Sequence, residues 1–291
     1  MISVASGKGG TGKTTIAVNL ALYLAKSQQI ALFDLDVEEP NDNHFLQRSM
    51  TYFQDVNIMR PVVNESICSH CGLCGELCEF NALAVLPQQV MIFSELCHGC
   101  GLCELACPTK AITENCHKLG TIEKAKNLSS LESTNISENL TFYEGTLRVG
   151  EALATPIIRE MKKVVFNEEY DNIILDLPPG SACPVIEALS DTDFVVLVTE
   201  PTPAGEHDLK IAIEVVKQLN IPFGIVNNRS DIGDDCINRL VKKEGYNLLS
   251  EIPHDTEILY LYSHGIPLIG SGKKFDSIFE NLWEHIQEIK R

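Results

Sequence analysis

The sequence has few basic residues and no long apolar run. Its 291 residues include 23 lysines and arginines against 40 aspartates and glutamates, which gives a formal net charge of −17. Such a charge repels a phosphate backbone and leaves no basic stripe for counterion release, so we expect no nucleic-acid partner. Apolar runs such as 194–198 are far shorter than the roughly 20 residues that a membrane-spanning helix needs, so we expect no stable membrane insertion.

The N-terminus also lacks the pattern of a secretory signal. It passes directly into short apolar residues, without a charged region followed by a long hydrophobic run. We therefore expect a cytoplasmic protein. In a reducing compartment, 11 cysteines indicate metal ligation or redox chemistry rather than a disulfide scaffold. The 44% of hydrophobic residues is enough for the buried core of one large α/β domain or two smaller ones.

Short apolar runs rich in valine and isoleucine alternate with amphipathic segments along most of the chain. The predicted strands are 1–5, 29–33, 172–176, 194–199 and 222–227, and the predicted helices are 13–26, 151–165, 205–219, 234–244 and 274–289. This alternation predicts an α/β fold with a mainly parallel sheet covered by helices on both faces. The last helix has one apolar face and balanced charges, so we expect it to pack on the core rather than bind a membrane.

Composition changes abruptly after about Pro61, where cysteine and glycine become dominant, and the α/β periodicity resumes only after Gly150. The change indicates an insertion. We expect the α/β domain to occupy residues 1–61 and 116–291, with the inserted domain at 62–115. The polar stretch within 115–144 is predicted to be an exposed connection with room for a strand.

The segment SGKGGTGKTT, from Ser6 to Thr15, has the spacing of a phosphate-binding loop. It satisfies G-x-x-x-x-G-K-[ST] between a predicted strand and a predicted helix, which is the context that this pattern requires. Lys13 would contact the β- and γ-phosphates, and the Thr14 hydroxyl would coordinate Mg²⁺. The alternative, a glycine-rich turn without a ligand, does not need the complete pattern. The expected nucleotide-binding residues of the loop are Gly7, Gly9, Gly10, Thr11, Gly12, Lys13, Thr14 and Thr15.

The second lysine of the loop, Lys8, makes KGGTGKTT similar to the deviant Walker A motif of the MinD, ParA and nitrogenase iron protein class of ATPases. ILDLPPG resembles the Walker B and switch II segment of this class, in which Asp176 would hold the Mg²⁺ shell. DLDVEEPN resembles switch I, and Asp36 would orient the attacking water. Asn228 and Arg229 lie where the class has its adenine-contacting pair.

This resemblance implies a P-loop NTPase fold of the SIMIBI type that binds ATP and Mg²⁺ and hydrolyses ATP. It also implies a nucleotide sandwich dimer, either a homodimer or a heterodimer with a related ATPase. In such a dimer Lys8 of one subunit contacts phosphate bound by the other, which couples turnover to dimerisation. The simpler interpretation of Lys8 is a solvated loop lysine.

Eight cysteines form two copies of the pattern C-x2-C-x2-C-x3-C, displaced by 29 residues. This spacing is that of two-cluster bacterial ferredoxins, in which the fourth cysteine of each run ligates the cluster of the other run. Two [4Fe-4S] clusters are therefore expected, and zinc is the alternative that the duplicated pattern disfavours. The first cluster would take Cys68, Cys71, Cys74 and Cys107, and the second Cys97, Cys100, Cys103 and Cys78.

Together the two halves resemble MinD-superfamily P-loop ATPases that contain an inserted ferredoxin-like domain. The resemblance implies an iron–sulfur ATPase in which a nucleotide-dependent dimer switch controls electron transfer through two [4Fe-4S] clusters. The alternative is an ATP-dependent carrier or scaffold for iron–sulfur or other metal clusters, similar to the Mrp-type ATPases. Either function requires a redox or cluster-acceptor protein as partner. A ParA-like positioning module is disfavoured, because oxygen-sensitive clusters add nothing to positioning.

Cys183 lies seven residues beyond Asp176, at the offset where the nitrogenase iron protein has a cluster-ligating cysteine. Two such residues across a dimer would hold a bridging or transferred metal. The other interpretation is a small residue at a helix start, followed by Pro184 at the first helical position. Both interpretations remain open from the sequence.

Overall fold

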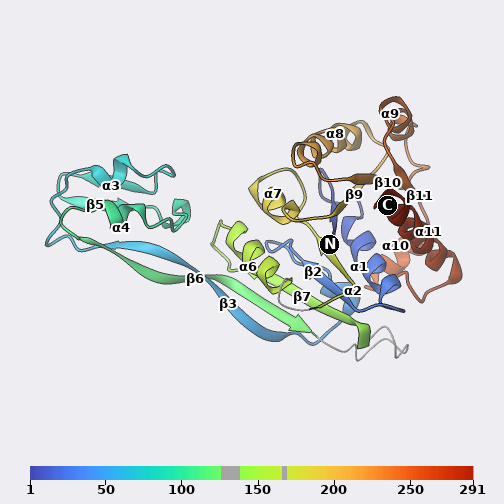
Figure 1. The fold of residues 1–291 in the computed structure, drawn as a ribbon, viewed down its shortest axis with the longest axis horizontal. Helices are drawn as coiled ribbons and strands as arrows, with labels where there is room; N and C mark the ends of the chain where they lie inside the picture. The colour runs from blue at the N-terminus through green and yellow to red at the C-terminus, as the bar shows by residue number, and fades with distance from the viewer. Residues whose placement is uncertain (126–137, 166–168, 291) are drawn as a thin grey trace.

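A nine-stranded sheet forms the centre of the molecule, in the order β11-β10-β9-β1-β8-β2-β7-β6-β3. The computed structural model describes residues 1–125, 138–165 and 169–290. The strands from β11 to β7 are parallel, and β6 and β3 extend the sheet in antiparallel pairing. The predicted mainly parallel α/β fold is therefore confirmed, and Figure 1 shows its helices packed around the sheet.

The strands are β1 (Ile2–Ala5), β2 (Ile30–Asp34), β3 (Thr51–Val63), β4 (Leu83–Leu86), β5 (Gln89–Ile92), β6 (Ile112–Ala125), β7 (Leu140–Leu147), β8 (Asn172–Asp176), β9 (Phe194–Thr199), β10 (Phe223–Asn228) and β11 (Leu248–Ile252). The helices are α1 (Lys13–Leu24), α2 (Asn43–Leu46), α3 (Leu73–Glu76), the 3₁₀ turn η1 (Ser94–Leu96), α4 (Leu102–Ala106), α6 (Thr155–Val165), α7 (Cys183–Leu189), α8 (Pro203–Gln218), α9 (Cys236–Glu244), α10 (Thr256–Ser263) and α11 (Lys273–Lys290).

Successive residues of the buried strands point to opposite faces of the sheet and build two separate cores. In β2, Ile30 and Leu32 pack on one side, while Ala31 and Phe33 pack on the other. Helices α1, α10 and α11 contribute to the first core, and α6 to α9 contribute to the second. The last helix packs on the core, as its apolar face predicts.

The parallel strands bring three loops to one edge of the sheet. Asp34 at the end of β2 lies in register with Asp176 at the end of β8, and Val4 of β1 also pairs with Asp176. Because the carboxyl ends of parallel strands share an edge, the loops that follow β1, β2 and β8 meet there. This edge holds the glycine-rich loop.

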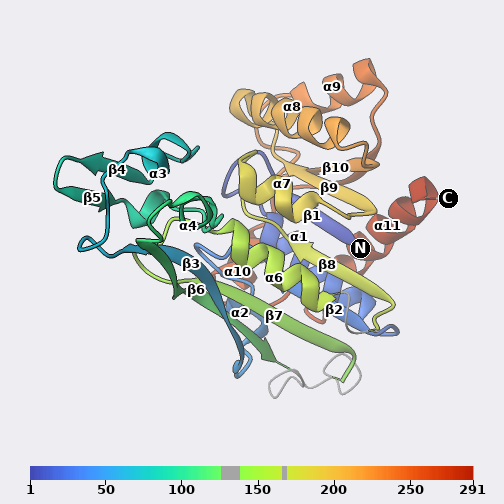
Figure 2. The same ribbon diagram turned by 60° about the vertical axis from the view of Figure 1, so that its left-hand side comes forward.

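Strands β3 and β6 form a long antiparallel ribbon that runs out of the sheet to a small separate unit (Figure 1). The unit contains both cysteine groups and a two-stranded sheet of β4 and β5. It has its own small apolar core, in which Leu83, Val90 and Ile112 pack beside cysteines. Figure 2 shows from a second direction that the ribbon passes along α6 before it reaches this unit.

Within 115–144, most of the described residues form strands, for which the prediction left room, but these are paired in the main sheet rather than forming an exposed connection. Residues up to Ala125 belong to β6, and residues from Leu140 belong to β7, which pairs with β2 inside the main sheet. The sequence NLSSLESTNISENL, which suggested the connection, falls mostly on residues 126–137, outside the described residues. The apolar residues of β7, including the fully buried Phe142 and Tyr143, pack in the two cores.

Glu151 fastens the ribbon to the body of the protein. Its carboxylate accepts hydrogen bonds from Arg60 Nη2 of β3 at 2.6 Å and from His117 Nε2 of β6 at 2.7 Å. Glu151, which makes these two hydrogen bonds, lies outside the helix. Pro156 is the second helical residue, a position that proline tolerates. Helix α6 therefore begins at Thr155, four residues later than predicted.

In the described part of the chain, no helix combines the length and the apolar character that crossing a bilayer requires.

Candidate functional site

The glycine-rich loop follows β1 and ends at the first residue of α1. Gly10 and Gly12 have φ values of 79° and 94°, which only glycine adopts without strain. A Cβ at Gly12 would lie 2.3 Å from Asn228 Nδ2, and one at Gly7 would lie 2.3 Å from the Asp208 carbonyl oxygen. The tight curvature leaves a cradle of backbone amides at the N-terminus of α1, and such a cradle fits phosphate.

Lys13 and Thr14, the first two residues of α1, both contact the carboxylate of Asp176. Lys13 Nζ donates to Oδ1 at 2.8 Å, and the Thr14 hydroxyl donates to Oδ2 at 2.7 Å. Burial alone would lower the pKa of Lys13, but the charge of Asp176 raises it, so the ammonium group stays protonated. A hydroxyl and a carboxylate at this distance, beside a phosphate cradle, fit the oxygen ligand set of Mg²⁺.

Three buried aspartates share this position, two at strand ends and one, Asp42, just before α2. Carboxylate oxygens of Asp34, Asp42 and Asp176 lie within 4.8 Å of one another. Burial, and next the charge of Asp176, raises the pKa of Asp34 to about 8. Burial, and next the charges of Asp34 and Asp176, raise the pKa of Asp42 well above its usual range. Such a concentration of buried carboxyl groups is stabilised by added positive charge, as from Lys13 and a divalent cation.

The loop opens into a cavity of about 360 Å³, large enough for a small-molecule ligand. Asp36, Asn228 and Arg229 line this cavity together with the P-loop residues Gly9, Gly10, Gly12, Lys13, Thr14 and Thr15. Of the expected residues, Gly7, Lys8, Thr11 and Asp176 do not line the cavity, although Asp176 contacts Lys13 and Thr14 at its edge. Thr11 is buried, and its carbonyl oxygen accepts a hydrogen bond from Asn228 Nδ2 at 2.8 Å. The role of Asn228 and Arg229 in adenine binding stays a prediction.

Lys8 forms an ion pair within its own subunit. Its Nζ atom lies 2.7 Å from Oε1 of Glu200, and Arg229 Nη1 lies 3.0 Å from Oε2 of the same carboxylate. Lys8 remains about one-third exposed, so it is accessible to a second subunit. Glu200 follows β9, and no sequence motif identified it as a partner of either cation.

We expect the rate of ATP hydrolysis to fall at acidic pH because of Asp36. Burial is the largest cause that raises the pKa of Asp36, to about 6. The carboxylate form is the stronger acceptor for an attacking water and the only form that can act as a base, so kcat at saturating MgATP should fall as pH decreases through about 6. Bound Mg²⁺ would shift the midpoint downward. The pH profile of the Asp36→Asn variant should lack this fall, and a flat profile of the unmodified protein between pH 5 and 8 would contradict the prediction.

The eight clustered cysteines line two adjacent cavities in the small unit. One cavity, called site I, is lined by Cys68, Cys71, Cys74 and Cys107. The other cavity, called site II, is lined by Cys97, Cys100, Cys103 and Cys78, with Cys74 also at its edge. Each site combines three cysteines of one run with the fourth of the other, as the ferredoxin resemblance implies. All eight are free thiols, so the donor set fits two [4Fe-4S] clusters.

Backbone amides point at several of these sulfur atoms. The amides of Ala82 and Ala111 each donate to a cysteine four residues earlier, Cys78 and Cys107, at 3.2 Å. These two contacts repeat each other with the displacement of the sequence duplication. Burial is the main cause that raises the pKa of the Cys103 thiol to about 11. Iron binding must therefore displace a proton from this thiol, since thiolates are the ligands.

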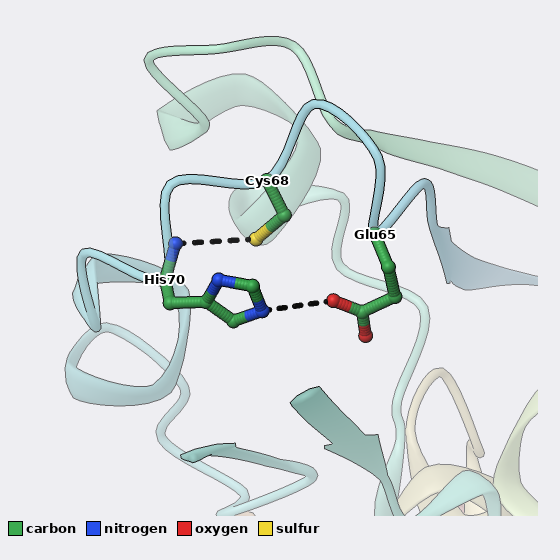
Figure 3. Close-up of side chains that lie close together, drawn as sticks. All are labelled: Glu65, Cys68 and His70. Atoms are coloured by element: carbon green, nitrogen blue, oxygen red, sulfur yellow. Dashed lines mark hydrogen bonds and ion pairs between the residues drawn. The ribbon is translucent and has the colours of Figure 1, made fainter. Parts of the chain in front are cut away.

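Site I has an additional contact beside Cys68, drawn in Figure 3. The His70 backbone amide lies 3.4 Å from Cys68 Sγ, and the His70 ring pairs with Glu65 Oε2 at 3.0 Å. The other Glu65 oxygen accepts from the Val90 amide at 2.9 Å. Both oxygens of Glu65 are therefore occupied, and the pair holds the loop that carries Cys68.

The remaining cysteines lie outside both cavities. Cys183 is exposed at the first residue of α7, followed by Pro184, which agrees with the simple helix-start interpretation; the bridging-metal interpretation stays untested. Cys116 is exposed on β6, and Cys236 is buried at the start of α9.

The chain is similar to known proteins, both in sequence and in fold, over most of its own length and theirs. A family model described as the CobQ/CobB/MinD/ParA nucleotide binding domain matches residues 2–268. An uncharacterized protein of Methanocaldococcus jannaschii is 33% identical over 268 residues, which cover 91% of this chain and 90% of that protein. The iron-sulfur cluster carrier protein of Pyrococcus furiosus is 24% identical over 310 residues, which cover 99% of this chain and 87% of that protein.

Among solved structures, the septum site-determining protein MinD with Mg-ADP from Pyrococcus horikoshii has a TM-score of 0.60 at 21% identity, over 100% of this chain and 98% of that one. This likeness shows a MinD-like P-loop fold. The family match agrees with the phosphate cradle that follows β1. The chain therefore belongs to the CobQ/CobB/MinD/ParA family of P-loop nucleotide-binding proteins.

Proposed function

We propose that this protein is an ATP-dependent iron–sulfur protein in which a nucleotide-driven dimer switch controls electron transfer through two [4Fe-4S] clusters. The observation that carries the proposal is the arrangement of eight cysteines as two cavities with four sulfur ligands each. Cys97, Cys103 and Cys107 are buried, which favours resident clusters over cargo that is released. Resident low-potential clusters are suited to electron transfer.

In the nucleotide site, the P-loop amides and Lys13 would hold the phosphates. Thr14 and Asp176 would hold Mg²⁺, which neutralises charge on the transferring phosphoryl group. Lys13 leaves Asp176 Oδ1 when it turns to phosphate, so nucleotide binding changes the contacts of the segment that follows β8. That segment leads directly into α7.

A chain of contacts supports coupling from α7 to the cysteine unit. Arg159 of α6 makes two hydrogen bonds with the Glu187 carboxylate of α7, at 3.1 and 2.8 Å. Lys162 Nζ donates to the Glu187 carbonyl oxygen at 3.1 Å. Glu151, just before α6, contacts both strands of the ribbon. A shift of α7 on nucleotide binding or dimerisation would therefore be transmitted through α6 to the ribbon.

The second candidate function is an ATP-dependent carrier or scaffold for iron–sulfur clusters. Two observations favour it: the relative from Pyrococcus furiosus is named an iron-sulfur cluster carrier protein, and Cys183 is exposed at the start of α7. In a dimer, two Cys183 side chains would hold a transferable cluster. The partner would then be an apo-protein that accepts the cluster rather than a redox protein.

One anaerobic experiment separates the candidates. Protein purified without oxygen is analysed for iron and recorded by EPR, with and without MgATP, and then mixed with an apo-ferredoxin. Electron transfer predicts about eight irons per chain, a fixed iron content, and a rate of cluster oxidation by a dye that changes with MgATP. A carrier predicts extra iron that passes to the apo-protein and is lost in a Cys183→Ala variant. Stoichiometric zinc in place of iron would refute both.

A further inference from the structure

The internal duplication places different residues at one equivalent position of the two cysteine sites. The displacement of 29 residues relates Val85 of β4 to Glu114 of β6. Val85 lines site I, and Glu114 lines site II. The two sites have the same kind of sulfur ligands, yet one has an isopropyl group where the other has a carboxyl group.

Glu114 is held against site II without a compensating partner. Its Oε1 atom is buried and has no hydrogen-bond partner in the described part of the chain. Its Oε2 atom lies 3.7 Å from where a Cβ of Gly101 would stand, between the ligands Cys100 and Cys103. Glu114 as a whole is half-buried, and a buried carboxylate oxygen without a hydrogen-bond partner calls for an explanation.

Site I also has a nearby glutamate, but its charge is offset. Glu65 accepts hydrogen bonds at both oxygens, from the His70 ring and from the Val90 amide (Figure 3). Its side chain is 42% exposed, so solvent screens the remaining charge. A second glutamate of site I, Glu76, lies 3.7 Å from where a Cβ of Gly72 would stand, but its side chain is exposed to solvent, whereas Glu114 is half-buried with one buried oxygen. Glu114 is therefore the least screened carboxylate beside either site.

We propose that Glu114 lowers the reduction potential of the site II cluster below that of site I, so that the two clusters form a directed pair. The inference rests on the proposed function, since it requires a cluster in each site. Reduction adds one electron to an already anionic cluster with four thiolate ligands, and a nearby carboxylate repels that electron. A valine at the equivalent position of site I exerts no such repulsion.

The positions of the two sites along the ribbon set the direction of electron transfer that this difference in reduction potential favours. Gly99, in the site II loop, packs so tightly on β3 that a Cβ there would lie 2.4 Å from Ile58 Cγ1 and 2.8 Å from the Met59 carbonyl oxygen. Ile58 pairs with His117, the residue that contacts Glu151 of the body. Site II is thus the site tied to the body-proximal part of the ribbon, and an electron that enters there moves energetically downhill to site I.

The test is redox potentiometry followed by EPR on the full-length, cluster-containing protein. Unmodified protein should show two potentials. Glu114→Gln, which keeps the shape and removes the charge, should raise the lower potential and leave the higher one unchanged. We expect at least a tenfold change in the ratio of reduced to oxidised site II cluster at fixed potential, which equals about 59 mV for one electron. Glu114→Val, which copies site I, should shift it in the same direction.

Glu95→Gln is the matched control, because it removes the same charge from an exposed position of the same unit and should leave both potentials unchanged. Equal potentials in the unmodified protein, no shift in Glu114→Gln, or an equal shift in Glu95→Gln would overturn the inference. Loss of site II iron in Glu114→Gln would also overturn it, since Glu114 would then be a ligand. The iron content of the unmodified protein separately judges the proposed function.

Discussion

Replacing Lys13 with alanine should reduce ATP hydrolysis by about 10²–10³-fold, the usual effect of removing one buried donor that stabilises transition-state charge. Lys13 is the P-loop lysine, lies at the N-terminus of α1 and is almost fully buried. Its ammonium group also pairs with Asp176. The substitution therefore removes both the phosphate contact and the cation that balances the aspartates, so nucleotide affinity should fall as well. Steady-state hydrolysis and equilibrium binding of a fluorescent ATP analogue measure the two effects.

The folding of this variant needs a control, because loss of one partner from a buried ion pair costs about 3–5 kcal/mol. Circular dichroism and iron content show whether the variant is folded. Lys26→Ala is the control, since Lys26 lies just beyond the C-terminal end of α1, pairs with Asp276 at the surface and lies outside the cavity. Lys26→Ala should retain full activity. Normal hydrolysis by folded Lys13→Ala protein would contradict the nucleotide site.

The second large effect concerns the pairing of the cysteine runs. Cys107 belongs to the second run in sequence, but it lines site I with the first run. Cys107→Ser should therefore remove the site I cluster and leave site II intact, which halves the iron content from about eight to about four per chain. Iron analysis and EPR of anaerobically purified protein measure the loss.

Double variants reveal which cysteines share a cluster. Adding Cys68→Ser to Cys107→Ser should cause no further loss of iron, because both residues belong to site I. Adding Cys97→Ser should remove the remaining iron, because Cys97 belongs to site II. The opposite result would show that each run binds its own cluster. Cys116→Ser, exposed on β6 outside both cavities, should leave the iron content unchanged.

Local sequence patterns predicted the central fold well. Strands such as β9 are short runs rich in valine that are buried at every position, and their length and β-branched residues distinguish them from helices. The ribbon was missed because residue type does not follow burial in β3: Tyr52 and Met59 are exposed, while Arg60 is buried. Its pairing with β6 joins residues between 49 and 73 positions apart, from Val63 with Ile112 to Thr51 with Lys124, which no local pattern contains.

The same distinction applies to the site. The P-loop and the cysteine runs are continuous motifs, so spacing alone identified the residues that the structure brings together. Glu200, Asp42 and Glu114 have no motif of their own. Each acts through a contact across the fold: Glu200 with Lys8, Asp42 with Asp34, and Glu114 with the loop that contains Gly101. For Glu114 alone a signal existed, because aligning the two cysteine repeats places it opposite Val85.

The ribbon connects the cysteine unit to the body by two hydrogen-bonded strands rather than by a single flexible linker. A single linker would let the unit sample many orientations, and a partner would have to select one of them at an entropic cost during docking. Two paired strands, held at Glu151, remove most of that freedom when the chain folds. The unit is thus presented to a partner already oriented, and more of the contact energy remains for affinity and for selecting the correct partner.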